Sequence, residues 1–176
     1  MDTNLTIEES FDSLYKNEIG KSKQSPLVGT LLIVVGLILV LVSVSIKSLE
    51  GTSMLYLLIM IGSIFAIVGI FVLLFRKTYY ISVQTRKKLK PYEIYFDPKE
   101  RDKLVRIMQN KNLNELKSLK LAVQDGLKLR VFTTADGEAC FSQVVTFIPY
   151  EYVNVTPVMK HTPEEAKILI ETFKLK

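Results

Sequence analysis

Two stretches of the chain consist mainly of apolar and small residues, with no charged side chain among them. They run from residue 27 to 46 and from residue 54 to 75. At a rise of 1.5 Å per residue, each stretch is about 30 Å long as a helix, the thickness of a bilayer's hydrocarbon core. A helix of a soluble protein usually keeps a polar stripe, because one side of it faces water. The pattern therefore predicts a two-helix transmembrane hairpin, with residues 47–53 as the short loop.

A cleaved signal peptide is the alternative interpretation of the first stretch. The preceding residues 1–26 contain several acids, among them Glu8, Glu9 and Asp12, whereas the start of a signal peptide is basic. The apolar run also exceeds the core of about 7–15 residues that such a signal contains. We therefore expect both stretches to be retained as membrane spans.

Lysine and arginine are concentrated on the outer sides of the predicted hairpin. Lys16, Lys21 and Lys23 precede the first span, no acid occurs between residues 76 and 92, and the loop contains only Lys47. Cytoplasmic flanks carry the excess of Lys and Arg, so we expect cytoplasmic termini and an extracytoplasmic loop. A helical hairpin followed by a small cytoplasmic domain recurs among bacterial inner-membrane proteins, and we predict an integral protein of the bacterial inner (plasma) membrane.

The net charge of +5 at first suggests a partner with many negative charges. The cations that follow the second span lie within residues 76–90, whereas residues 91–176 are nearly balanced in charge. The positive charge thus belongs to a basic juxtamembrane segment, which favours anionic lipid over nucleic acid. We predict that six cations contact lipid headgroups: Arg76, Lys77, Arg86, Lys87, Lys88 and Lys90. The alternative is a solvated turn that only obeys the orientation rule.

Small residues recur at helical spacing in both predicted spans. Such residues let two helix backbones approach closely where lipid gives no hydrophobic drive for association. We predict that these positions pack the two helices together; a groove for a second copy or another membrane protein is the alternative. The predicted packing residues are Gly29, Gly36, Ser43, Gly62, Ala66 and Gly69.

Residues 1–26 form a polar cytoplasmic segment with one helical signal. Thr6 and Glu9 have the spacing of a capping box, and Ile7, Phe11 and Leu14 then fall on one face. The pattern predicts a short amphipathic helix, which lies on the membrane or docks on the following domain; a frayed tail is the third possibility.

The remaining chain, residues 91–176 with a first strand from about residue 78, has the pattern of a small α+β domain. Alternating or β-rich runs predict strands at 79–84, 92–96, 119–124, 127–132, 138–148 and 152–155. The dipeptide Asp125-Gly126 predicts a tight hairpin turn between two of them. Inward-facing residues of that hairpin are expected to be Leu119, Leu121 and Val123 opposite Leu127, Leu129 and Val131.

Two helices complete the predicted domain. Asp97 with Glu100, and Thr162 with Glu165, have capping-box spacing, and each pair encloses a proline at the first helical position. The first helix is expected to reach about Asn110, and residues 112–118 are either helix or loop. Buried faces are expected at Leu104, Ile107 and Met108, and at Ala166, Leu169, Ile170 and Phe173. The fold class predicted for this domain is an antiparallel meander sheet with two helices.

Catalytic and metal-binding patterns are weak. His161 is the only histidine and Cys140 the only cysteine, so neither has a sequence partner for metal binding or a disulfide. We expect His161 in a solvent-exposed loop and Cys140 as a small core residue. No glycine-rich phosphate loop or G-x-S-x-G motif occurs. We therefore predict no catalytic, metal or cofactor-binding residue and no enzymatic activity.

Tyrosines in the two related stretches PYEIYF and PYEYV are the candidate partner surface. Tyrosine provides contact area at little entropic cost, although core and edge packing is the simpler explanation. The candidate residues are Tyr92, Tyr95, Tyr150 and Tyr152.

Together these patterns predict a non-enzymatic integral membrane protein whose cytoplasmic domain binds a protein partner or forms a homo-oligomer, as an accessory or assembly subunit. The alternative is a sensor of anionic lipid that uses the basic segment at residues 86–90. An enzyme acting on a membrane-associated substrate would need a cleft that groups His161 with acids. A pore of oligomerised hairpins would need a polar lining, for which the spans supply only a few hydroxyls.

Overall fold

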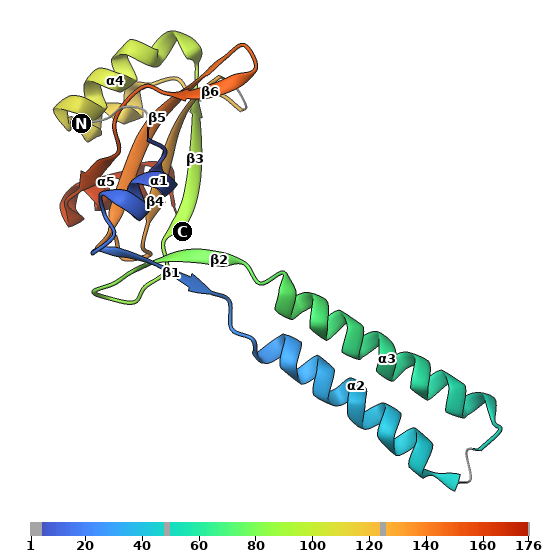
Figure 1. The fold of residues 1–176 in the computed structure, drawn as a ribbon. Helices are drawn as coiled ribbons and strands as arrows, with labels where there is room; N and C mark the ends of the chain where they lie inside the picture. Colours follow the sequence, from blue (N-terminus) through green and yellow to red (C-terminus); the bar gives the residue numbers. More distant parts are fainter. Residues whose placement is uncertain (1–4, 48–49, 124–125, 176) are drawn as a thin grey trace. The chain divides into compact units, whose positions relative to one another are not determined.

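The structure is a computed structural model that describes residues 5–47, 50–123 and 126–175, in two compact units (Figure 1). The sheet unit comprises Met1–Lys21 and Tyr80–Lys176, and the hairpin unit comprises Ser22–Tyr79. The hairpin unit is therefore an insertion in the chain of the sheet unit. Predictions for residues 1–4, for Ser48 and Leu49 of the loop, and for Asp125 lie outside the described residues.

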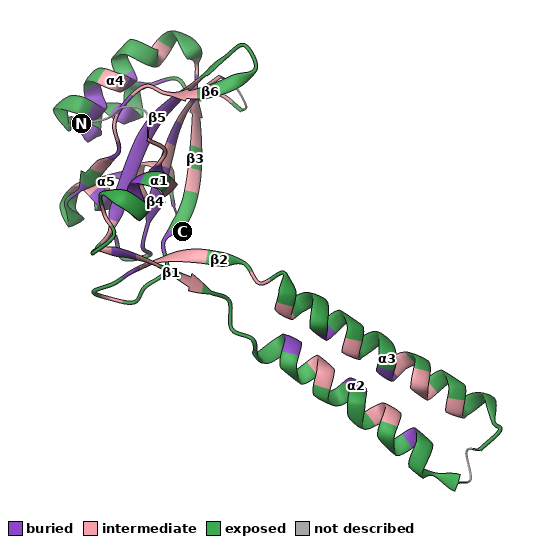
Figure 2. Ribbon diagram, in the orientation of Figure 1, coloured by how far each residue is buried: buried purple, intermediate pink, exposed green. Residues whose placement is uncertain are grey.

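The hairpin unit contains two antiparallel helices, α2 (Leu27–Ser45) and α3 (Ser53–Leu74), both long and apolar enough to cross a membrane. Their buried positions are small residues: Gly29, Gly36 and Ser43 on α2, and Gly62 and Gly69 on α3. A Cβ atom added to Gly36 would lie 2.5 Å from the Gly62 carbonyl oxygen and 2.7 Å from the Ala66 nitrogen. The two backbones are in direct contact, and most larger residues of both helices are exposed, as the green colour in Figure 2 shows.

A five-stranded antiparallel sheet forms the centre of the sheet unit. The strands β3 (Lys90–Phe96), β4 (Leu127–Thr133), β5 (Cys140–Ile148) and β6 (Glu151–Asn154) pair in chain order, and β7 (Met159–His161) also pairs with β5. The predicted α+β class is thus confirmed.

One face of this sheet is covered by helices that follow β3 and β7. These are α4 (Arg101–Asn110), preceded by the 3₁₀ turn η2 (Pro98–Glu100), the 3₁₀ helix η3 (Leu113–Ser118) and α5 (Pro163–Phe173). Alternate residues of β4, namely Leu127, Leu129 and Val131, are fully buried against them, because successive side chains of a strand point to opposite faces. This layer is the main hydrophobic core.

The helix α1 (Ile7–Ser13) covers part of the opposite face. Ile7 and Phe11 are buried there together with Phe132 and Phe141 of β4 and β5, whereas Leu14 is 56% exposed. The predicted Thr6–Glu9 capping box is present. Of the three alternatives for this segment, docking on the domain is therefore the observed one.

The two strands of a short β-ribbon flank the two hairpin helices in the sequence. The strand β1 (Ile19–Lys23) pairs with β2 (Thr78–Ser82), and the boundary between the units falls within both strands. The sequence predicted β2 but not β1, because the residues IGKSK contain a single β-branched side chain.

The hairpin predicted around Asp125-Gly126 is wrong. The strand β4 pairs with β3 on one side and β5 on the other, and residues 119–123 contribute only one bridge, between Leu121 and Phe96 of β3. Leu121 and Val123, expected to face inward, are exposed, whereas Leu119 is buried. The alternating residues 127–132 do belong to a strand, β4. Its partner β3, however, lies farther away in the sequence than the predicted partner segment.

The helix predictions are confirmed with small changes. Thr162 and Glu165 form the expected capping box of α5, and Leu104, Ile107 and Met108 of α4 are buried. Asp97 instead caps the turn η2 by accepting a hydrogen bond from the Lys99 N–H at 3.1 Å. The open question at residues 112–118 is answered by the 3₁₀ helix η3.

Candidate interaction surface

The face of the sheet that carries α1 is covered only in part. The ion pair between Arg130 of β4 and Glu8 of α1 (Nη2 to Oε1, 2.5 Å) lies at the limit of the covered part. Lys128 stands on the same face two residues before Arg130, because side chains alternate along a strand. Around it are Tyr95, Phe147 and Tyr152, and we call these four residues the aromatic surface.

The aromatic surface is ordered by contacts among its own side chains. Lys128 Nζ lies 4.0 Å from the centroid of the Tyr152 ring and 2.9 Å from Glu93 Oε1. The rings of Phe147 and Tyr152 meet edge to face at 5.1 Å, yet 48% and 47% of these residues stay exposed. A cation over an aromatic ring adds about 0.5–1 kcal/mol at an exposed site. The result is a fixed, half-exposed apolar surface.

Glu93 lies on the edge strand β3, and its carboxylate contacts both Tyr95 and Lys128 of the aromatic surface. Partial burial raises the pKa of the Glu93 carboxyl, but hydrogen bonds from Tyr95 and Lys128 outweigh that effect and lower it overall. The same hydrogen bond to Glu93 raises the pKa of Tyr95. Glu93 is therefore a carboxylate whose charge is offset by Lys128 at neutral pH.

The turn between β5 and β6 ends in an unusual residue. Tyr150 has a φ of 81° and is 99% exposed, and it follows Pro149. Proline followed by positive φ is the pattern of a type II turn, in which glycine normally takes the second central position. A non-glycine residue in the left-handed region costs about 1–2 kcal/mol. Tyr150 is therefore an exposed aromatic residue with a strained backbone, at a position where glycine would make the turn more stable.

The four predicted surface tyrosines do not all share this location. Tyr95 and Tyr152 belong to the aromatic surface, and Tyr150 occupies the adjacent turn. Tyr92 packs against the core on the opposite face, beside α4 and α5. Sequence reasoning did not identify Phe147 and Lys128, whose positions depend on the register between β4, β5 and β6.

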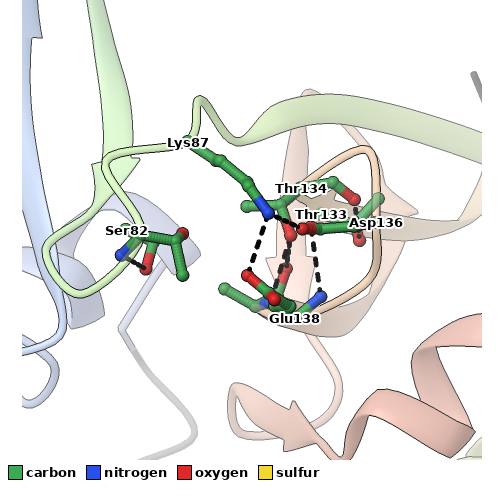
Figure 3. A network of polar contacts seen from close by, with 8 residues as sticks. Ser82, Lys87, Thr133, Thr134, Asp136 and Glu138 are labelled. Carbon is green, nitrogen blue, oxygen red and sulfur yellow. Dashed lines mark hydrogen bonds and ion pairs between the residues drawn. The ribbon is translucent and has the colours of Figure 1, made fainter.

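The basic segment is more structured than a free juxtamembrane turn. Lys87 Nζ contacts Asp136 and also Glu138, the latter at 3.2 Å (Figure 3). The hydrogen bond from Lys87 holds the pKa of Asp136 well below its usual range. Leu89, between two of the predicted cations, is buried with α1, and Arg86 adopts a φ of 54° in the turn.

Of the other predicted headgroup contacts, Arg76 and Lys77 lie near the end of the hairpin unit, Lys88 lies between β2 and β3, and Lys90 begins β3. Arg76 Nε donates to the Leu73 carbonyl at 3.2 Å, and Lys77 accepts a backbone hydrogen bond from Gln24. Lys88 and Lys90 are exposed. Lys87 is the member of the set whose charge is engaged by two acids.

The expectation of an exposed His161 is wrong. His161 is 3% exposed in β7, its Nε2 lies 2.6 Å from Ser142 Oγ, and its Nδ1 lies 3.4 Å from Glu165 Oε2. Burial lowers the pKa of His161. The trio has the residue types of a hydrolase triad, but Ser142 is fully buried, so no substrate reaches its hydroxyl. Sequence spacing alone does not bring these three residues together.

Cys140 is buried as expected, and its burial raises the thiol pKa to about 12, which makes it a poor nucleophile. Within the described ranges, no three His, Cys, Asp or Glu side chains gather as metal ligands. No protein family, curated protein or solved structure matches the chain.

Proposed function

We propose that the protein is a non-enzymatic membrane protein in which α2 and α3 form a transmembrane hairpin and the sheet unit binds a protein partner in the cytoplasm. Such a chain serves as an accessory or assembly subunit of a membrane complex. The distribution of Lys and Arg supports cytoplasmic termini, and the membrane proposed is the bacterial inner membrane.

The observation that carries the proposal is that each unit leaves an apolar surface uncovered. In the hairpin unit, residues such as Leu31, Leu41 and Phe71 are more than half exposed although water would disfavour them. Burial of apolar area contributes roughly 25 cal/mol per Å², so a surface of this extent favours lipid strongly. In the sheet unit, the aromatic surface and Tyr150 supply the residue types that dominate protein interfaces.

The composition of the two helices favours a membrane anchor over a channel. Neither α2 nor α3 contains an Asp, Glu, Lys, Arg or His residue. The hydroxyls of Ser43 and Ser45 donate to carbonyls of their own helix, at 2.6 and 2.8 Å, and so are satisfied without a pore.

The lipid-sensor alternative uses the basic segment at residues 86–90 as the ligand of anionic headgroups. Each cation near an anionic bilayer contributes about 1 kcal/mol. Because Lys87 is already paired with two acids, it contributes less to the binding of anionic lipid. We therefore rank this alternative second.

Site-specific photocrosslinking tests the partner-binding proposal. A photoreactive phenylalanine replaces Tyr150 in the full-length protein in its native cells, and the matched control replaces Lys103 on the exposed side of α4. We expect one identified protein to be captured at position 150 and not at 103, and its co-purification to fall when Tyr152 is changed to Ser. Equal adducts at both positions, or none at 150, would contradict partner binding.

Alkaline carbonate extraction tests the anchor separately. We expect the wild-type chain to stay in the membrane pellet, and its release into the supernatant would refute the transmembrane hairpin.

A further inference from the structure

The strand β3 is the edge of the sheet, and the described residues cover only part of its outer side. Ala122 N–H donates to the Tyr95 carbonyl at 2.9 Å, and Asp97 N–H donates to the Lys120 carbonyl at 3.0 Å. Odd-numbered residues of β3 therefore direct their backbone groups away from β4. By this alternation the N–H and C=O of Glu93 and the N–H of Tyr95 also point outward. None of these three groups has a hydrogen-bond partner among the residues that the structure describes.

Residues 120–122 of the chain itself occupy the first part of this edge. Leu121 forms a bridge opposite Phe96, and Ala122 is the last described residue that bonds to β3. The next side chain, Val123, is 99% exposed. Residues 120–122 thus lie where an additional antiparallel strand would begin, and no described residue pairs with the edge beyond them.

A groove of about 430 Å³ lies beside the open edge. Ile94, Leu121 and Phe173 supply apolar walls, and Thr172 and Lys174 supply polar ones at the end of α5. A volume of this size accommodates one or two side chains of a bound segment. Figure 2 shows β3 partly exposed, in contrast to the buried β4 and β5.

Two polar groups in the groove lack partners in the described part of the chain. The Thr172 hydroxyl is buried without a hydrogen bond, and a buried unpaired hydroxyl is unfavourable. Lys174, held at a φ of 52° where α5 ends, forms no ion pair with a described residue. Because Lys128 already offsets the charge of Glu93, Lys174 makes the groove favourable for an anion.

We propose that the open edge of β3 binds an extended peptide of a partner protein as an additional strand, with an apolar side chain in the groove and a carboxylate at Lys174. This inference rests on the proposed function that the sheet unit binds protein. Main-chain hydrogen bonds provide affinity in this mode of recognition, and the groove provides selectivity. The carboxylate belongs either to an Asp or Glu side chain or to a chain terminus.

A second copy of the chain is a poorer occupant of the edge. Two antiparallel β3 strands that pair through their outward groups, in the register centred on Glu93, would place Glu93 opposite Glu93 of the other copy. Like charges directly opposite each other destabilise a strand pair. The position of Pro91 also removes one N–H from such a pairing.

Peptide selection on the full-length protein in phosphatidylcholine nanodiscs tests the proposal. The probe is a library of random heptapeptides with free carboxyl termini, with an amidated library as the second arm. We expect enriched peptides to alternate apolar and polar residues and to contain an acid or to require the free terminus. On binding, amide hydrogen exchange at Glu93 and Tyr95 should slow at least about tenfold, as expected for groups that gain hydrogen bonds.

The decisive comparison is Glu93→Pro against Glu93→Ala. Both changes remove the carboxylate, but only proline removes the edge N–H, and proline is tolerated on edge strands. We expect Glu93→Pro to weaken binding of an enriched peptide about tenfold relative to Glu93→Ala, and Lys174→Glu to weaken it by a similar factor. A thermal melt confirms that each variant is folded.

Three results would overturn the proposal. These are no peptide enriched above empty nanodiscs, equal binding by the two Glu93 variants, or a wild-type dimer that Glu93→Pro dissociates. If the edge fails while crosslinking at position 150 still captures a partner, the proposed function stands and only this site is wrong. If neither assay finds a bound protein or peptide, both fail.

Discussion

Phe11→Ala tests whether α1 is an integral part of the sheet unit. Phe11 is 1% exposed, and its ring centroid lies 5.0 Å from those of Tyr80 and Phe141 and 5.5 Å from that of Phe132. Removing a buried phenylalanine costs about 3–5 kcal/mol, because the transfer energy is lost and a cavity remains. That is a large share of the 5–15 kcal/mol that typically stabilises a domain.

The matched control is Leu14→Ala, which removes an apolar side chain from the same segment where it is 56% exposed. A change at such an exposed position is expected to cost within about 0.5 kcal/mol. The comparison separates loss of the buried contact from any loss of hydrophobic residues in general.

Urea unfolding of the full-length protein in detergent micelles measures the difference. The chain contains no tryptophan, so tyrosine emission reports on the sheet unit, which includes Tyr15 and Tyr80 beside Phe11. With a slope of about 2 kcal/mol per M, Phe11→Ala should lower the midpoint by about 2 M. A midpoint within about 0.3 M of that of Leu14→Ala would refute the docking of α1 as a stabilising contact.

Four further predictions follow. Gly36→Leu should widen the spacing of α2 and α3 in distance measurements between spin labels, because its side chain meets the Gly62 carbonyl; an unchanged spacing would contradict the contact. His161→Gln should flatten the dependence of stability on pH. Burial lowers the folded pKa of His161, so the unfolded chain binds the proton more readily and wild-type stability falls as pH drops through about 6.5; equal slopes for both proteins between pH 7 and 5 would contradict this. Tyr150→Gly should stabilise the sheet unit by about 1 kcal/mol in the urea assay and reduce partner capture, and a destabilised variant would refute the strain argument. Hydrogen exchange of residues 83–90 should be the same in phosphatidylcholine nanodiscs with and without phosphatidylserine, and slower exchange with the anionic lipid would favour the sensor alternative.

The elements predicted correctly are those whose signals are local. The capping boxes of α1 and α5 and the apolar faces of α4 and α5 depend on residues three or four positions apart. The errors arise where a strand's partner is distant. Asp125-Gly126 is a strong local turn signal, yet β4 pairs with β3 from more than thirty residues earlier, as Ile94 opposite Leu129 shows.

The candidate surface was predictable only in part for the same reason. Tyrosines are visible in the sequence, and strand alternation alone would have placed Tyr92 and Tyr95 on opposite faces. Lys128 and Phe147 join Tyr95 and Tyr152 only through the register of four strands. The burial of His161 likewise depends on Ser142 and Glu165, which lie on another strand and a helix.

The insertion of the hairpin within the sheet unit has a consequence for biosynthesis. Ile7 and Phe11 leave the ribosome early, but Phe132 and Phe141, which cover them, are translated only after both apolar helices. In the proposed membrane topology, the amino-terminal segment therefore lacks this core until the carboxyl-terminal part has been made on the same side. A polypeptide whose first and last segments share one core can cross a bilayer only an even number of times, and two crossings is the smallest such number.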